Sequence, residues 1–372
     1  MKLIITGGHL SPALAFIEAL PKDVDVLFVG RKYAFEGDEG ISLEHQSASR
    51  LGIPFVSITT GRIQRTFTKY TLLSLLKIPV GLVQAFVLLQ KNKPDGLVCF
   101  GGYISVPVAF AAYILRIPIV IHEQTLEAGF ANRLIALVAT KICISWKDSE
   151  KFFPKNKTIL TGNPLRKVFF QTEIEPLSFV SYDFQQEKLP CIFVTGGSTG
   201  SHVINCLLEE SLPAILRFAK VIHQTGDARM YGDFDRLEKL RGKLSKDMQK
   251  RYVPVKFLMP KEVNTAIKTA NLVIGRSGIN TITELLFLEK MALLIPLVNT
   301  QKDEQKKNAE FLKEKGLAEV LGQQTVTSSH FLSVVQRMLR QKEKYILKGD
   351  MGEVGNAQQA AGKIVEVVSE VV

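Results

Sequence analysis

Short runs of apolar, often β-branched residues alternate along the whole chain with longer segments whose apolar residues recur at helical spacing. In the first half, the runs that predict strands are Leu3–Thr6, Val24–Val29, Phe55–Ile58, Gly96–Phe100, Ile119–Ile121 and Ile142–Ile144. Segments such as Ser11–Leu20 and Val106–Leu115 predict the intervening helices. Nearly continuous apolar strands separated by helices are typical of a parallel sheet covered on both faces. The pattern therefore predicts an α/β fold.

The alternation stops at residues 170–189, which contain a proline and show no clear period, so we predict a linker there. It restarts in the predicted strands Cys191–Thr195, Val221–Gln224, Lys256–Leu258, Leu272–Ile274 and Leu293–Val298. We predict two doubly wound, parallel-sheet domains, residues 1–165 and 166–351, the second including the linker. Their strand-end loops are expected to face each other across a cleft. The last helical stretch, residues 352–372, can pack back on the first domain.

Composition limits the cellular compartments and the binding partners that fit this protein. The formal charge of +11 favours anionic lipid headgroups, phosphorylated ligands or nucleic acid. No nucleic-acid recognition module is present, so we expect no nucleic-acid partner. The start MKLIITGG predicts a first strand and not a signal peptide, and no stretch approaches the roughly 20 apolar residues that span a bilayer. The four cysteines form no CxxC pair and predict buried thiols in a reducing compartment.

One segment, Arg62–Lys93, has a basic start, an apolar middle and a basic end, interrupted by Pro79 and Gly81. It can lie in a membrane interface, with its apolar residues in the acyl boundary and its lysines on anionic headgroups. A crossover helix that covers the sheet is the alternative, and both can hold for opposite faces. We expect a protein that is cytoplasmic or bound peripherally to the cytoplasmic face of the cell membrane.

In the second half, a glycine-rich loop with Gly197 and Ser198 links a strand to a helix. Glycines let the backbone approach a ligand closely, and a helix start offers free N–H groups, which suits a diphosphate. A plain tight turn is the alternative.

A second strand–loop–helix junction contains Ser277, Gly278 and Glu284. We predict that Ser277 caps the helix and that the Glu284 carboxylate accepts hydrogen bonds from ribose hydroxyls. A capping box between Thr281 and Glu284 is the alternative. After a further strand, the side chains of Asp303 and Gln305 suit a sugar ring, although a solvated helix start would look the same.

In the first half, Gly7, Gly8 and His9 follow the first strand, and Ser11 is predicted to cap the next helix. His9 would then lie in the loop at the sheet edge, where an imidazole can accept a proton near neutral pH. Tyr103 follows another strand of the same sheet.

The pair Asp233 and Asp235 matches the DxD pattern that holds a divalent metal in some glycosyltransferases. It precedes a charged helix and does not end an apolar strand, so we interpret it as a helix start and predict no metal site.

Taken in order, the motifs resemble the MurG family of N-acetylglucosamine (GlcNAc) transferases, which have the GT-B fold of two Rossmann-like domains. The matching segments are TGGHLSPALA, GGYISVP, HEQ…AGFAN, TGNPLR, TGGSTGS, HQTG, RSGINTITE and DEQKKNA. The resemblance implies that the second domain holds UDP-GlcNAc, a substrate, and that the first receives undecaprenyl-diphosphate-MurNAc-peptide (lipid I). It implies an inverting transfer that gives lipid II in peptidoglycan synthesis, with no cofactor and no metal.

By position, the resemblance assigns Ser198 to the donor phosphates, Arg166 to the donor site, Glu284 to the ribose and Gln305 to the sugar hydroxyls. The other residues placed at the donor are Gly197, Ser277, Gly278 and Asp303. In the first domain it assigns His9 and Glu123 to catalysis, His9 being our first choice of general base. The acceptor side would be lined by Gly7, Gly8, Tyr103, Thr125 and Asn132.

The chain departs from the family pattern at several positions. Its first glycine loop is shorter than the usual GGTGGH, so it offers fewer amides to an acceptor diphosphate. Thr125 replaces the asparagine of HEQN, Val106 replaces the second glycine of GGYxSGP, and residues 30–50 are atypical.

Three alternatives stay open. One is a related GT-B enzyme that glycosylates another lipid, such as diacylglycerol. Another is a non-hydrolysing UDP-GlcNAc epimerase, which needs no lipid. The last is a non-enzymatic scaffold that binds a nucleotide sugar at the membrane.

Overall fold

The chain folds into two compact units in the computed structural model. The first comprises Met1–Lys167 and Glu353–Val372, and the second Val168–Gly352. The structure describes residues 1–33, 41–61, 69–173, 177–197, 199–227, 230–298 and 303–372.

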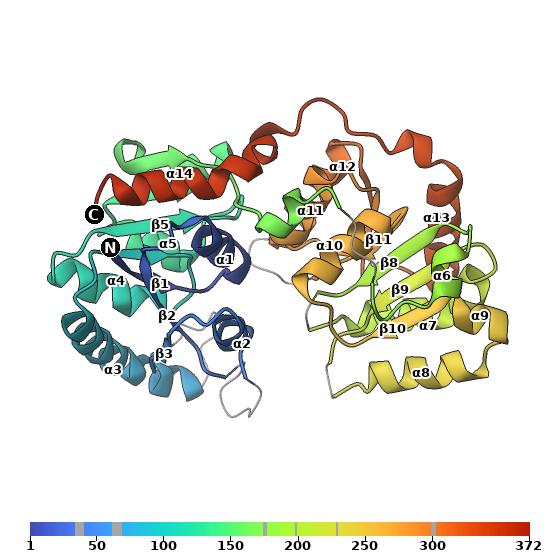
Figure 1. Cartoon of the computed structure of the whole chain (residues 1–372), viewed down its shortest axis with the longest axis horizontal. Coiled ribbons are helices and arrows are strands. Elements are labelled where there is room, and N and C mark those ends of the chain that lie inside the picture. The colour runs from blue at the N-terminus through green and yellow to red at the C-terminus, as the bar shows by residue number, and fades with distance from the viewer. Residues whose placement is uncertain (34–40, 62–68, 174–176, 198, 228–229, 299–302) are drawn as a thin grey trace. The chain divides into compact units, whose positions relative to one another are not determined.

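The first unit is built on a seven-stranded parallel sheet (Figure 1). Its strands are β1 (Lys2–Thr6), β2 (Asp25–Gly30), β3 (Phe55–Ser57), β4 (Gly96–Cys99), β5 (Ile119–Glu123), β6 (Lys141–Ile144) and β7 (Thr158–Leu160). They lie in the order β3-β2-β1-β4-β5-β6-β7.

Successive side chains of a strand point to opposite faces of the sheet, and in these strands both sets are apolar. Helices therefore cover both faces. They are α1 (Leu10–Ala19), α2 (Leu43–Arg50), α3 (Lys69–Asn92), α4 (Ser105–Ile114), α5 (Phe130–Ile135) and α14 (Ala357–Ser369). Leu3 and Ile5 of β1 pack with α1 and α14 on one face, whereas Ile4 packs with α3 and α4 on the other.

The second unit repeats the architecture with six parallel strands in the order β10-β9-β8-β11-β12-β13. These are β8 (Cys191–Thr195), β9 (Lys220–Gln224), β10 (Tyr252–Val255), β11 (Leu272–Gly275), β12 (Ala292–Leu294) and β13 (Ala318–Val320). The helices are α6 (Tyr182–Gln186), α7 (His202–Ile215), α8 (Asp233–Lys243), α9 (Lys246–Lys250), α10 (Pro260–Thr269), α11 (Ile279–Phe287), α12 (Glu304–Glu314) and α13 (Ser328–Arg340).

Both sheets reverse their winding direction at one place, between β1 and β4 in the first unit and between β8 and β11 in the second. In open α/β sheets, the carboxyl ends of the strands beside such a switch point are where ligands bind. The topology therefore marks the loops after these four strands as the ligand-binding loops of each unit.

The predicted fold class, two Rossmann-like parallel sheets, is confirmed, but some predicted strands are wrong. The strand expected at Lys256–Leu258 lies at Tyr252–Val255 instead. Pro254 concealed it, and a proline fits there because β10 is the edge strand of its sheet. The strand expected at Leu293–Val298 ends at Leu294. The short outer strands β7 and β13 were not predicted.

The segment predicted as a linker is partly structured. It contains α6, and Leu177, Val180 and Phe184 are buried. The Lys220 ammonium donates hydrogen bonds to the carbonyl oxygens of Phe184 and Glu187, at 2.7 and 2.8 Å. These contacts hold the segment against the second unit.

The amphipathic segment Arg62–Lys93 forms α3 from Lys69 onward, and residues 62–68 lie outside the described residues. Ala85 and Leu89 on α3 are buried against the first sheet, which confirms the crossover helix. Within the described ranges, no helix is long and apolar enough to cross a membrane.

Three of the four cysteines, Cys99, Cys143 and Cys191, are buried on strands as predicted, whereas Cys206 on α7 is half-buried. All four are free thiols. Burial raises the pKa of the three strand thiols to about 12, so they remain protonated.

Candidate active-site residues in the two units

The first unit brings the loops after β1 and β4 into direct backbone contact. A Cβ built on Gly8 would lie 2.4 Å from the carbonyl carbon of Gly101, and one on Gly7 would lie 2.6 Å from the Phe28 ring. Gly101 and Gly102 both have positive φ angles. Only glycine satisfies these constraints, so both loops present bare backbone at the switch point.

His9 lies in this contact and immediately precedes α1. Its backbone N–H donates to the carbonyl oxygen of Phe100 at 3.0 Å, and its ring Nδ1 is buried without a hydrogen-bond partner. Burial lowers the pKa of His9, an effect that Glu123 partly opposes. A neutral imidazole with an unused nitrogen is suited to accept a proton.

The predicted cap at Ser11 is wrong, because α1 begins at Leu10 and His9 occupies the cap position. Pro12 therefore stands within the first turn. A proline is tolerated there because the first turn's N–H groups have no partner inside the helix.

The Glu123 carboxylate is fully buried and holds the surrounding loop together. Its Oε1 accepts hydrogen bonds from the backbone N–H (3.0 Å) and hydroxyl (2.6 Å) of Thr125, and its Oε2 accepts from Gly129 N–H (2.9 Å) and Asn132 Nδ2 (3.0 Å). Four donors occupy both oxygens. Glu123 therefore positions these loop residues, and its assignment to catalysis stays a prediction.

Thr125 and Asn132 thus point toward Glu123. Thr125 also donates to the carbonyl oxygen of Glu127 at 2.7 Å, so the threonine that replaces the family's asparagine closes this turn. The Oδ1 atom of Asn132 is buried with no hydrogen-bond partner, and its Nδ2 would lie 3.5 Å from a Cβ on Gly101. Buried polar atoms without partners are rare, and here two residues that carry one, Asn132 and His9, both border Gly101.

Tyr103, the remaining acceptor-side candidate, follows β4 and is half-buried against the core under α3 and α4.

Arg166 lies in the first unit, where it pairs with Glu18 of α1. Its Nε and one terminal nitrogen reach Glu18 Oε1 at 2.8 and 2.6 Å, and Lys167 N–H donates to Oε2 at 2.9 Å. This pairing secures the chain where it leaves the first unit, and the assignment of Arg166 to the donor site stays a prediction.

In the second unit, the glycine-rich loop after β8 packs against the end of β9. Gly197 and Gly200 have φ angles of 83° and 78°, and a Cβ on Gly200 would lie 2.0 Å from the Thr225 carbonyl oxygen. Ser201 caps α7 by accepting from Ile204 N–H. Ser198, the predicted phosphate contact, lies outside the described residues.

A buried hydrogen bond joins the loop after β11 to the start of α12, which follows β12. Ser277 is fully buried, and its hydroxyl donates to the carbonyl oxygen of Gln305 at 2.7 Å. It therefore does not cap α11, whose cap position is Gly278. Gln305 Oε1 accepts from Leu297 N–H at 2.9 Å, and Asp303 adopts a left-handed conformation (φ 55°) before α12.

Glu284 lies on the first turns of α11 and is half-buried. Over the described residues, no hydrogen bond or ion pair reaches its carboxylate, and the Thr281–Glu284 capping box does not form. Burial raises the pKa of Glu284 to about 8. A carboxylate that lacks protein partners at a switch-point helix is a candidate ligand-binding group.

Asp233 and Asp235 lie in the first turn of α8, as predicted for a helix start. In the parts of the chain that the structure describes, no group of three His, Cys, Asp or Glu residues is arranged to hold a metal ion.

Sequence reasoning assigned no role to three buried polar residues near these loops, namely Asn205 and the histidines of the HEQ and HQTG motifs, His122 and His223. Burial lowers the pKa of both histidines to about 3, so both rings are neutral. The sequence feature that could have indicated a role for them is a histidine within an otherwise apolar strand. Such a residue is buried and needs hydrogen-bond partners in the core.

Family models match both halves of the chain: glycosyltransferase family 28 N-terminal domain over residues 4–144, and its C-terminal domain over residues 191–365. Two curated relatives are named UDP-N-acetylglucosamine--N-acetylmuramyl-(pentapeptide) pyrophosphoryl-undecaprenol N-acetylglucosamine transferase. The one from Trichlorobacter lovleyi is 33% identical over 100% of this chain and 98% of its own. The one from Lachnospira eligens is 31% identical over 99% of both.

The chain belongs to the MurG family. It is a hexosyltransferase, as the resemblance implied.

Solved structures agree on the fold. MurG from Acinetobacter baumannii is similar with a TM-score of 0.64 and 24% identity, covering 100% of both chains. A UDP-GlcNAc 2-epimerase from Neisseria meningitidis has a TM-score of 0.68 and 14% identity, again covering 100% of both chains. Identities this low show the shared GT-B fold alone.

The unpaired carboxylate of Glu284 gives a prediction about stability. Its pKa of about 8 in the folded protein lies above the ordinary 4.5, so the folded state binds this proton more tightly than the unfolded state does. Stability is therefore lost as pH rises from about 4.5 to 8. Glu284→Gln should raise the free energy of unfolding at pH 8.5 by about 1–3 kcal/mol and leave it unchanged at pH 4.

Denaturant unfolding measures this difference, with the exposed Glu366→Gln of α14 as the control. At pH 8.5, where the wild-type carboxylate is mostly ionised, we expect the stabilised Glu284→Gln variant to bind UDP more weakly, because a neutral amide is a weaker acceptor for ribose hydroxyls. Equal stability of wild type and variant at both pH values would refute a buried, partnerless carboxylate.

Proposed function

We propose that this enzyme transfers GlcNAc from UDP-GlcNAc to undecaprenyl-diphosphate-MurNAc-peptide, giving lipid II with inversion at the anomeric carbon. The observation that carries the proposal is the shared name of the curated relatives, which match at 31% and 33% identity over essentially the whole chain. Four of the MurG-family motifs, TGGHLSPALA, GGYISVP, TGGSTGS and RSGINTITE, also fall on the switch-point loops of the two units.

The second unit supplies the donor site in this proposal. Backbone groups of the loop before α7, which contains Gly197 and Ser198, and of Gly278 at the start of α11 bind the diphosphate, while Glu284 accepts from the ribose. These groups stabilise the negative charge that develops on UDP as it leaves, and the loss of one such donor typically costs about 3–4 kcal/mol in the transition state. Arg166 is the further donor-site residue of this proposal.

The first unit supplies the acceptor site and the base. The exposed backbone at Gly7 and Gly8 receives the acceptor, with Tyr103 and Asn132 nearby, and His9 takes the proton from the attacking hydroxyl. Glu123 holds Thr125 and Asn132 in place.

A transfer assay tests the proposal directly. Purified enzyme, labelled UDP-GlcNAc and a lipid I analogue should yield a β-1,4-linked disaccharide lipid and UDP. Diacylglycerol in place of lipid I should give no product, and UDP-GlcNAc alone should be neither epimerised nor consumed. Turnover with diacylglycerol, or epimerisation without an acceptor, would assign the chain to one of the alternative activities.

His9 as the base gives a pH prediction. A base acts in its neutral form, and the pKa of His9 is lowered, so kcat should stay constant as pH falls through the ordinary histidine pKa of 6.5 and decline only below it. His9→Gln should reduce kcat by about 10²- to 10⁴-fold and abolish this acid limb.

The matched control is His330→Gln at the exposed start of α13, which should leave the pH profile unchanged. An undiminished kcat in His9→Gln would remove His9 from the mechanism.

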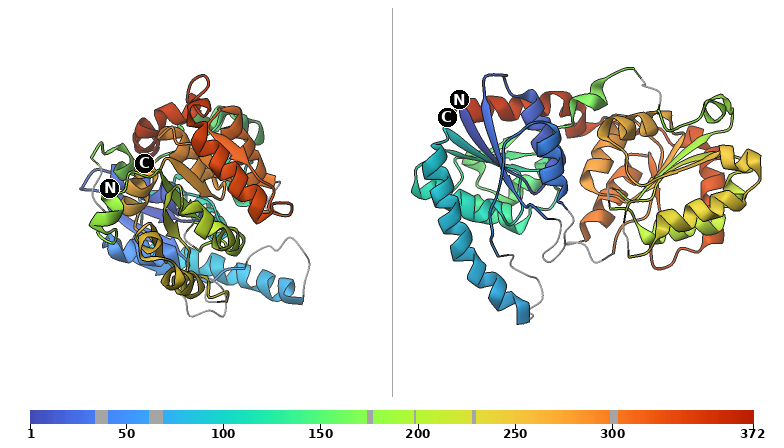
Figure 2. Two further views of the ribbon diagram at one scale, coloured as in Figure 1. Left: turned by 90° about the vertical axis from the view of Figure 1, so that its right-hand side faces the viewer. Right: turned by 60° about the horizontal axis from the view of Figure 1, so that its bottom comes forward.

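A stripe on α3 supports peripheral binding at the cytoplasmic membrane face. Leu76, Val80, Val83 and Val87 recur at helical spacing and are 48–64% exposed. The right-hand view of Figure 2 shows this helix extending beyond the sheet of its own unit. We propose that the stripe enters the acyl boundary while Lys91 and Lys93 meet anionic headgroups.

The double variant Val83→Glu/Val87→Glu should weaken sedimentation with anionic vesicles by about tenfold or more, because it places two charges in the apolar stripe. Ile346→Glu changes an equally exposed residue of the second unit and should have no effect. Affinity for UDP should be the same in all three proteins. Unaltered vesicle binding by the α3 variant would place the membrane contact elsewhere.

A further inference from the structure

The segment His223–Gly226 (HQTG) ends β9 and has no role in the mechanism above, yet it contacts the glycine-rich loop at two points. The Gln224 amide Nε2 donates to the Gly197 carbonyl oxygen at 3.0 Å. At the second point, a Cβ on Gly226 would lie 2.4 Å from both Cα and N of Gly200. The backbone of Thr225 and Gly226 therefore forms the surface on which the loop rests.

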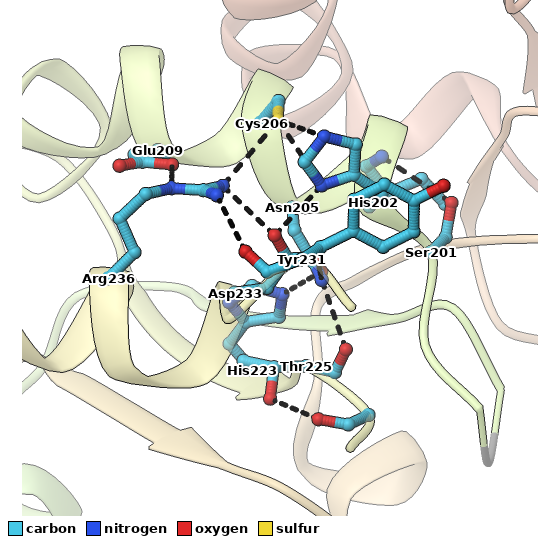
Figure 3. Close-up of polar contacts among 12 residues, drawn as sticks. Ser201, His202, Asn205, Cys206, Glu209, His223, Thr225, Tyr231, Asp233 and Arg236 are labelled. Atoms are coloured by element: carbon cyan, nitrogen blue, oxygen red, sulfur yellow. Dashed lines mark hydrogen bonds and ion pairs between the residues drawn. The ribbon is translucent and has the colours of Figure 1, made fainter. Parts of the chain in front are cut away.

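Asn205 of α7 holds this surface from below. Its Nδ2 donates one hydrogen to the Thr225 carbonyl oxygen at 3.0 Å and the other to Asp233 Oδ2 at 2.7 Å (Figure 3). The reversed amide would place an oxygen against two acceptors, so this orientation is the one that forms hydrogen bonds. Asn205 is only 1% exposed, so protein groups must satisfy its amide.

The amide orientation fixes the protonation of His223. Asn205 Oδ1 is left as an acceptor and lies 3.0 Å from His223 Nε2, which must carry the hydrogen. His223 Nδ1 then accepts from the Tyr252 hydroxyl at 2.9 Å. Each donated hydrogen in this series of hydrogen bonds has one acceptor. The donors therefore point in a single direction, from Tyr252 through His223 and Asn205 to Thr225.

The other end of the chain is anchored at the start of α8. Asp233 Oδ1 lies 2.8 Å from His202 Nδ1 and 3.0 Å from an Arg236 nitrogen, and Arg236 also pairs with Glu209 at 2.7 Å. Figure 3 shows these groups converging on Asp233. The hydrogen-bonded chain thus links α7, β9, β10 and α8 beneath one loop.

We propose that Tyr252, His223 and Asn205 are positioning residues that fix the Thr225–Gly226 backbone, and through it hold the glycine-rich loop ready for the donor diphosphate. This inference rests on the proposed function, because it assumes that the loop binds UDP-GlcNAc. A buried polar chain gives less stability than apolar packing, but once fully satisfied it favours one arrangement of the groups it joins.

Two substitutions at His223 separate this role from general stability. Glutamine places its amide N–H near the position of Nε2, whereas asparagine reaches only the position of Nδ1. His223→Gln should keep the affinity for UDP within about threefold of wild type. His223→Asn should weaken it by about tenfold or more, because Asn205 loses its donor and the Thr225 backbone can shift.

Calorimetric titration with UDP measures the affinity, and steady-state kinetics should show a larger rise in KM for UDP-GlcNAc than fall in kcat. Glu209→Gln removes only the outer partner of Arg236 and should leave both quantities unchanged. Equal UDP affinity in His223→Gln and His223→Asn would overturn the proposal.

The nitrogen-15 NMR spectrum of the His223 ring in the wild-type protein provides a test that needs no variant. It should show the neutral Nε2–H form, with and without UDP, across the neutral pH range. An Nδ1–H form or a charged ring would overturn the hydrogen-bond direction. If wild type itself fails to bind UDP, the proposed function fails, whereas UDP binding with the wrong tautomer contradicts the positioning role alone.

Discussion

The close approach of bare backbone where strands end beside the switch point of each sheet is the constraint on which the rest of this structure depends. In the first unit Gly8 after β1 meets Gly101 after β4, and in the second Gly200 after β8 meets Gly226 after β9, at separations that leave no space for a side chain. Loops that follow neighbouring parallel strands can converge this tightly only when they lack Cβ atoms. The convergence leaves helix starts at the edge where a nucleotide sugar and its acceptor are expected to bind.

Such loops need support from beneath, and each unit supplies it with a buried polar side chain that bonds to backbone. Glu123 accepts four hydrogen bonds in the first unit, and Asn205 donates two in the second. Ser277 joins two further loops in the same way. Among the described residues, two of the groups without hydrogen-bond partners, His9 Nδ1 and the Glu284 carboxylate, are those to which we assign contacts with substrate. Residues whose hydrogen-bonding groups are all paired hold the loops in place, whereas these two unpaired groups are available to substrates.

The sequence predicted the sheets well because buried parallel strands are apolar runs, as in β1 and β8. It failed for β10, where Pro254 concealed an edge strand, and for the short strands β7 and β13. It also misplaced two caps that serine suits by residue type. Ser11 lies inside α1, which begins at Leu10, and the Ser277 hydroxyl bonds instead to the distant Gln305 carbonyl oxygen. Candidate residues were found through their motifs, whereas the partners of Asn205, which lie 18 to 28 residues away in the sequence, depend on tertiary contacts that no local pattern encodes.

The central claim is that the strand-end loops of the second unit bind the diphosphate of UDP. Amide hydrogen exchange of the full-length enzyme, followed by mass spectrometry with and without UDP, tests it most directly. The account predicts slower exchange in peptides covering residues 195–203 and 275–281, and unchanged exchange in the loops around His9 and Gly101. Protection confined to the first unit, or absent from both of these segments at saturating UDP, would contradict it.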